Sequence, residues 1–144
     1  MSLLRILSLI VLPLSIFAEK ANVLIITIDD LKPTLACYGD KYAVSPNIDS
    51  LADNGTLFTS NYCQQAVCAP SRISMFTGLR PDTTGILDLH THMRDINPDI
   101  LTMPQYFKEN GYLSIGYGKL MHGAKNDDKE LSWSELGDDL PYNK

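Results

Sequence analysis

The sequence predicts an α/β fold with a mainly parallel central sheet flanked by helices. Three observations support this prediction: a continuous apolar run at 22–28, the alternation of strand-like and helix-like segments after it, and a sequence free of internal repeats or low-complexity tracts. With 144 residues, of which 44% are hydrophobic, the chain can bury one core. We therefore expect one folded domain, or part of one, over residues 19–144.

Residues 1–18 are typical of a signal peptide and not of a folded element. Arg5 supplies a positive charge, residues 6–17 are almost wholly apolar, and Ala18 is an acceptable cleavage position. Because the apolar run is short for a membrane span, we expect a secreted or periplasmic protein without stable membrane insertion. The alternative is an uncleaved N-terminal anchor.

The charge of the chain restricts its partners. A formal net charge of −5 argues against nucleic acid as a partner, because a phosphate-tracking surface needs a basic stripe and the sequence has none. Any site for sulfate or phosphate must therefore be built locally, from a metal ion and a few well-placed cations.

The apolar run at 22–28, Asn-Val-Leu-Ile-Ile-Thr-Ile, is typical of a central parallel strand covered on both faces. Asp29 and Asp30 follow it directly. Ligands gather beyond the carboxyl ends of strands in open α/β sheets, so two adjacent carboxylates there are well placed to hold a hard cation. The alternative is a polar strand end at which one aspartate caps a turn.

A short amphipathic helix is predicted after the next loop. Ser45 is its expected N-cap, Pro46 its first residue, and Gly55 lies near its end. Residues 56–62 alternate well enough to form a second strand, which leads towards Cys68.

The segment Cys68-Ala69-Pro70-Ser71-Arg72 is predicted to open a second helix. Pro70 fits the first turn, apolar residues follow at helical spacing, and Gly78 can close the C-terminus. The free amides and the positive dipole end of a helix start lower the pKa of a thiol, and Arg72 can lean towards the same end. From the pattern alone, a small buried hydrophobe is the commoner role for such a cysteine.

The stretch after this helix has weaker signals. Residues 80–84 are turn-like, and His90, His92 and Arg94 lie in a segment without clear periodicity. A metal site is disfavoured because no third ligand lies near the two histidines in sequence. A part in substrate recognition is more plausible than catalysis, and the sequence leaves the choice open.

A third helix and a further strand are predicted next. Thr102 and Gln105 have capping-box spacing, the helix stops at Asn110-Gly111, and residues 112–117 form a short strand. Lys119 and His122 follow that strand, although an isolated Lys-x-x-His pair is weak evidence for a site. From residue 125 onward the chain is predicted to be a solvated connection without a closing element.

The residues Cys68 to Arg72, followed by Thr77-Gly78, resemble the cysteine-type signature of the sulfatase family, in which a maturation enzyme converts the cysteine to Cα-formylglycine. The longer run at 64–72, with 80–84 and 104–112, looks like the iduronate 2-sulfatase branch of that family. The resemblance implies an alkaline phosphatase/sulfatase-like fold, of which this chain carries an incomplete N-terminal part.

The resemblance also implies an activity and a set of site residues. The expected reaction is hydrolysis of sulfate esters, with sulfated carbohydrate as the substrate, a formylglycine nucleophile and a calcium ion. The formylglycine-generating maturation enzyme is a further expected partner. The expected calcium ligands are Asp29, Asp30 and residue 68, and the residues expected to act on the formylglycine or the sulfate are Arg72, Lys119 and His122.

The chain also departs from the family pattern. The further calcium ligands, second histidine and second lysine of the family cannot be placed in this sequence, so we expect an N-terminal fragment that is inactive alone. The alternatives are a phosphonate or phosphodiester hydrolase of the same superfamily, and a truncated non-catalytic protein that binds anions. Cys37 and Cys63 are compatible with one disulfide or with two buried thiols.

Overall fold

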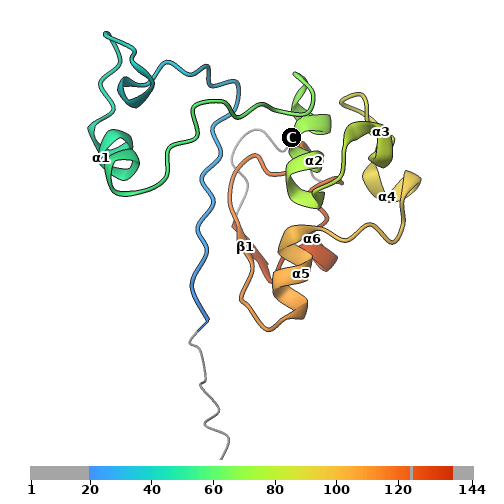
Figure 1. Cartoon of the computed structure of the whole chain (residues 1–144). Helices are drawn as coiled ribbons and strands as arrows, with labels where there is room; N and C mark the ends of the chain where they lie inside the picture. Colours follow the sequence, from blue (N-terminus) through green and yellow to red (C-terminus); the bar gives the residue numbers. More distant parts are fainter. Residues whose placement is uncertain (1–19, 124, 138–144) are drawn as a thin grey trace, which may run out of the picture. The chain divides into compact units, whose positions relative to one another are not determined.

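The computed structural model describes residues 20–123 and 125–137 (Figure 1). The chain divides into two units, the first ending at Asp30 and the second beginning at Leu31. The predicted signal peptide lies outside the described residues. The described elements are η1 (Ala36–Tyr38), α1 (Pro46–Asn54), α2 (Cys68–Thr77), α3 (Pro81–Thr84), α4 (Met93–Ile96), α5 (Met103–Glu109), β1 (Ile115–Gly116), α6 (Lys129–Ser132) and β2 (Glu135–Leu136). Each helix among these residues is too short to cross a membrane.

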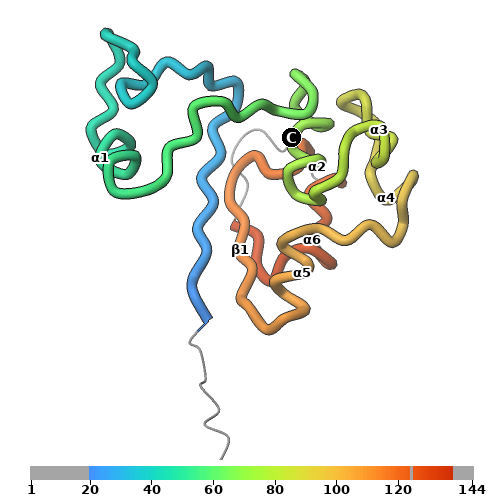
Figure 2. Tube along the Cα trace, in the orientation of Figure 1, coloured from blue at the N-terminus to red at the C-terminus, as the bar shows by residue number. Residues whose placement is uncertain are grey.

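The described part of the first unit is a single extended trace over residues 20–30 that ends in a turn at Asp29 and Asp30 (Figure 2). The predicted strand at 22–28 is wrong as regards pairing, because the described residues hold one sheet, which consists of β1 and β2. Its side chains are correspondingly exposed, with Leu24 at 84% and Ile26 at 74%. A strand needs neighbouring strands for its backbone hydrogen bonds, and the described residues provide none for this segment.

Helix α1 confirms the predicted helix, with Pro46 in its first turn. Ser45 is the N-cap residue, as predicted, but its side chain accepts no hydrogen bond from the helix amides. Ser45 Oγ instead donates to Asp49 Oδ1 at 3.0 Å and accepts from the Ala36 amide, while Asp49 Oδ1 also accepts from the Cys37 amide at 2.9 Å. These contacts attach α1 to η1.

The predicted strand at 56–62 is also wrong, since no residue of that segment is assigned to a strand. Its alternating side chains are exposed on both faces. Alternation stabilises a strand only where one face can be buried, which this segment does not achieve.

Helix α2 organises the core of the second unit. It forms as predicted and ends at Gly78, whose φ of 69° is the left-handed conformation that closes a helix most easily with glycine. The helix contacts α3 and α5, and α5 contacts α6 (Figure 1). The buried apolar residues are Ala69, Ile73, Phe76, Ile86, Met93, Ile100, Met121 and Trp133.

Helix α5 confirms its predicted cap. Thr102 Oγ1 accepts a hydrogen bond from the Gln105 amide at 3.2 Å. The same hydroxyl lies 2.7 Å from Ser132 Oγ, and both residues are fully buried. Thr102 therefore caps α5 and also joins it to α6.

The C-terminal segment corrects the prediction of a solvated connection. It contains α6 and β2, and β2 pairs in parallel with β1, so that Ile115 faces Glu135 and Gly116 faces Leu136. Asp127 is only 3% exposed. The predicted strand at 112–117 is confirmed in the shorter form of β1, and the α/β class is confirmed by helices combined with a parallel sheet.

Candidate active site

Cys68 is the first residue of α2 and carries a half-buried free thiol. Val67 is the N-cap, and its side chain makes no capping hydrogen bond. The first amides of a helix lack partners within the helix, so residue 68 lies at the end of α2 where negative charge is stabilised. This is the setting that the sequence predicts for it. Cys37 and Cys63 are likewise free thiols.

Arg72 links α2 to the segment Gly118–Gly123, which we call the site loop. The side chain is 7% exposed, and its Nη1 donates to the carbonyl oxygens of Lys119 at 2.5 Å and Leu120 at 2.9 Å. Residues separated by 47 positions in the sequence are thus brought together within the second unit. Arg72 thus joins the helix that begins at Cys68 to the loop that carries Lys119.

The site loop has an unusual backbone. Gly118, His122 and Gly123 have φ values of 73°, 73° and 101°. Glycine adopts such angles easily, but His122 is a non-glycine residue in the left-handed region, where strain is common at functional sites. Lys119 and His122 are half-buried, whereas the side chain of Met121 is fully buried in the core. Met121 therefore anchors the loop between the two predicted site residues.

Asp127 is a site-loop contact that the sequence prediction missed. Its Oδ1 accepts from the Met121 amide at 2.6 Å, and its amide donates to the Gly123 carbonyl at 2.9 Å. Burial raises the pKa of Asp127, while the Met121 hydrogen bond and the Arg72 charge act in the opposite direction. An Asp-Asp pair beside lysines looks solvated in sequence, because the partners that bury Asp127 are not its neighbours in the chain.

The guanidinium group of Arg94 is held by hydrogen bonds to other residues of the second unit. Its Nε and Nη2 donate to Asp128 Oδ2 at 3.1 and 2.6 Å, and its Nη1 donates to the Ile100 carbonyl at 2.7 Å. His92 Nε2 hydrogen-bonds to the Lys125 carbonyl. These contacts hold α4 against the start of α6, and a part of this segment in substrate recognition stays a prediction.

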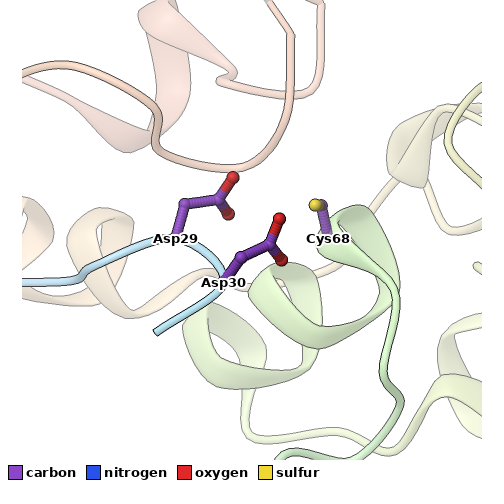
Figure 3. A group of neighbouring side chains, drawn as sticks. All are labelled: Asp29, Asp30 and Cys68. Carbon is purple, nitrogen blue, oxygen red and sulfur yellow. The ribbon is translucent and has the colours of Figure 1, made fainter. Parts of the chain in front are cut away.

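Asp29 and Asp30 belong to the first unit, and both residues are exposed. Figure 3 shows their carboxylate side chains. Asp30 has a φ of 53°. Their carboxylates are hard oxygen donors of the kind that calcium prefers, whereas the sulfur of Cys68 is a soft donor. The oxygens of a hydrated formylglycine at residue 68 would match the two carboxylates. The donor chemistry thus fits the predicted calcium site, and its assembly with residue 68 stays a prediction.

The helices and the parallel sheet agree with the α/β fold that the sequence resemblance implied, and Cys68 lies at the start of a helix, as its motif predicted. The sulfatase family model matches residues 21–143. The chain therefore belongs to the sulfatase family.

Several curated proteins are similar to the chain. Iduronate 2-sulfatase of Mus musculus is 50% identical over 120 residues, and that of Homo sapiens is 51% identical over 120 residues, covering in each case 81% of this chain and 22% of the relative. A sulfatase of Formosa agariphila is 42% identical over 116 residues, covering 76% of this chain and 23% of the relative. The chain thus spans about a fifth of the length of these relatives.

Proposed function

We propose that the protein to which these residues belong is an exported sulfatase of the iduronate 2-sulfatase type, which hydrolyses sulfate esters of glycans. The observation that carries the proposal is the contact of Arg72 with the carbonyls of Lys119 and Leu120, because it joins the two segments that resemble the family's catalytic motifs. The names of the similar proteins support sulfate as the group removed. The apolar N-terminal residues support export.

Two groups would complete this chain's site. Conversion of Cys68 to formylglycine, by a maturation enzyme acting on the cysteine motif, would supply a hydrated aldehyde as the nucleophile towards sulfur. A calcium ion held by Asp29, Asp30 and residue 68 would neutralise charge on the bound sulfate.

The chain's own residues would then orient and stabilise the reacting groups. Lys119 would donate to a sulfate oxygen, and its ammonium group would offset the charge that develops there. His122 would hydrogen-bond to a hydroxyl at residue 68 and hold it in position. Arg72 would contribute its buried positive charge while its Nη1 keeps the site loop against α2.

The test combines mass spectrometry with turnover on the complete exported protein. The peptide that contains residue 68 should be about 18 Da lighter than its thiol form, the difference between a thiol and an aldehyde side chain. Wild type should release sulfate from uronate 2-sulfates, and Cys68→Ala should release none. Cys63→Ser is the matched control, because Cys63 is an exposed free cysteine outside both motifs, and it should keep wild-type turnover.

The alternatives give different results in the same assay. Faster turnover of matched phosphate esters than of sulfate esters would identify a phosphonate or phosphodiester hydrolase. An unmodified thiol with no turnover of either ester would contradict the proposal and indicate a non-catalytic protein that binds anions.

A further inference from the structure

We propose that Asp127 is a positioning residue of the active site, whose buried carboxylate holds the site loop in the conformation that presents Lys119 and His122. The inference rests on the proposed function for its catalytic consequence. It goes beyond the motif residues, because Asp127 lies in neither family motif and acts through the backbone of the loop.

The site loop needs such support because of its backbone conformation. Its left-handed residues include His122, and a non-glycine residue in that region persists only when its surroundings hold it there. Short loops that carry functional side chains on a strained backbone relax when their anchoring contacts are removed. The backbone conformation at His122 is therefore supported by contacts of the surrounding residues.

Asp127 provides such a contact by accepting a hydrogen bond from a backbone amide of the loop. Its carboxylate accepts from the Met121 amide at 2.6 Å, one residue before His122. Asp127 is itself fixed, since Trp133 Nε1 donates to its carbonyl at 2.7 Å and its own amide donates to Gly123 at 2.9 Å. Trp133 packs edge-on against Phe76 of α2, with ring centroids 6.1 Å apart, so the support extends to the core.

Arg72 provides the matching contact by donating hydrogen bonds to backbone carbonyls of the loop. It donates to the carbonyls of Lys119 and Leu120, whereas Asp127 accepts from the next amide along the chain. The loop is thus held by a buried cation on one side and a buried carboxylate on the other. Burial raises the pKa of Asp127, and the positive charge of Arg72 acts in the opposite direction. Arg72 therefore offsets part of the cost of burying the Asp127 carboxylate.

Asp128 offers a matched control in the same segment. Its side chain is 11% exposed, and its Oδ2 accepts from Arg94 at 2.6 Å and from Ser132 at 2.7 Å. These partners lie in α4 and α6 and not in the site loop. Loss of the Asp128 carboxylate should therefore destabilise the fold without moving Lys119 or His122.

The experiment compares wild type, Asp127→Ala, Asp127→Asn and Asp128→Ala in the complete protein, with turnover corrected for the folded fraction. Asp127→Ala should lower kcat about 10-fold to 100-fold with a smaller change in KM, as is typical when a group that orients active-site residues is removed. Asp127→Asn should recover most of kcat, because its amide oxygen can accept from Met121. Asp128→Ala should keep wild-type kcat, and equal kcat values for the two alanine variants would overturn the proposal.

Hydrogen exchange separates this inference from the proposed function. The Met121 amide should be the slowest to exchange in the site loop of the wild type, and Asp127→Ala should accelerate it while Asp128→Ala should not. If wild type cleaves no sulfate ester, the proposed function fails and exchange alone decides on Asp127. If the alanine variant does not fold, the wild-type measurement still decides, because an unprotected Met121 amide would overturn the proposal.

Discussion

At the scale of single residues, Asp127 brings an ionisable group into the core. Burial raises the pKa of its carboxyl above the ordinary value of 3.8, and the Met121 amide and the Arg72 charge offset this effect incompletely. The folded state therefore holds the proton of Asp127 more tightly than the unfolded chain does. It follows that this residue's contribution to the free energy of unfolding is largest at low pH and falls as pH rises from about 3.8 through the folded pKa.

Replacing Asp127 by asparagine removes this titration. The thermal midpoint of Asp127→Asn relative to wild type should therefore increase as pH rises through the window from 3.8 to the folded pKa, and should then stay level. Thermal unfolding of both proteins at a series of pH values measures the effect. A difference that does not change with pH would contradict it.

Asp88 is a control of opposite sign for that measurement. The amides of Thr91 and His90 hold the pKa of this exposed carboxyl below 3.8, so its contribution to stability is present above that value and is lost as pH falls through the folded pKa. The thermal midpoint of Asp88→Asn relative to wild type should therefore decrease as pH rises. If the thermal midpoint relative to wild type changed in the same direction with pH for both variants, a different group would dominate the titration.

At the scale of elements, α5 depends on Thr102 for its start and for its attachment to α6. Thr102→Ala removes the acceptor for the Gln105 amide and the buried contact with Ser132 Oγ. Loss of an N-cap costs about 1 kcal/mol, and the additional buried hydrogen bond raises the expected loss to about 2 kcal/mol. Chemical denaturation measures the change, with Thr59→Ala as an exposed control that should alter stability by less than about 0.5 kcal/mol.

The sequence predicts α1, α2 and α5 well because their signals are local. Proline in the first turn of α1, Gly78 after α2 and the hydroxyl of Thr102 before α5 each act within a few residues of the helix they define. Ser45 shows the limit of such signals, because it is the N-cap residue of α1 but its side chain makes no capping hydrogen bond. Its hydroxyl instead donates to Asp49 and accepts from the amide of Ala36. Ala36 lies nine residues earlier in the chain, so a local sequence signal does not predict this contact.

The strands and the C-terminal segment could not be predicted in the same way. Strand β2 exists because Glu135 and Leu136 meet β1, about 20 residues earlier in the chain, and neither strand has more than two residues. The run at 22–28 has the composition of a central strand, but composition does not supply the neighbours that a ladder requires. Asp127 was misjudged although its contacts with Met121 and Trp133 lie only six positions away, because neither contact follows a helix or strand spacing.

The candidate site depends on sequence motifs to which the structure adds one connecting contact. The motif around Cys68 and the pair Lys119 and His122 are sequence features, and Arg72 joins them through the site loop. What the motifs could not provide was the support behind them, because the Asp127 carboxylate accepts from a backbone amide of the loop and so leaves no pattern in side-chain spacing. Such residues are found from coordinates and not from motifs.

At the scale of the whole molecule, the proposed calcium site would need more ligands than the residues predicted for it. Calcium takes about six to eight oxygen ligands, and Asp29, Asp30 and a modified residue 68 would provide fewer than that. The chain spans about a fifth of the length of the relatives that it matches. We therefore expect calcium affinity to be a property of the complete protein, and that is where its removal should be tested.

Removal of calcium from the complete protein should lower both its thermal midpoint and its turnover, because a ligand that binds only the folded state stabilises it. Added calcium should restore both, and magnesium should do so less well, since its smaller octahedral shell suits an extended carboxylate site poorly. Asp30→Asn should weaken the apparent calcium affinity about tenfold or more through the loss of a charged ligand.

Asparagine tolerates the left-handed backbone of Asp30, whose φ is 53°, so this substitution tests the charge and not the turn. Asp53→Asn removes the same charge from an exposed position in α1 and should leave calcium affinity unchanged. Calorimetric titration of the chelated proteins distinguishes the two variants. Equal affinities for Asp30→Asn and Asp53→Asn would remove Asp30 from the calcium site and leave the ion, if bound, to be held by other residues.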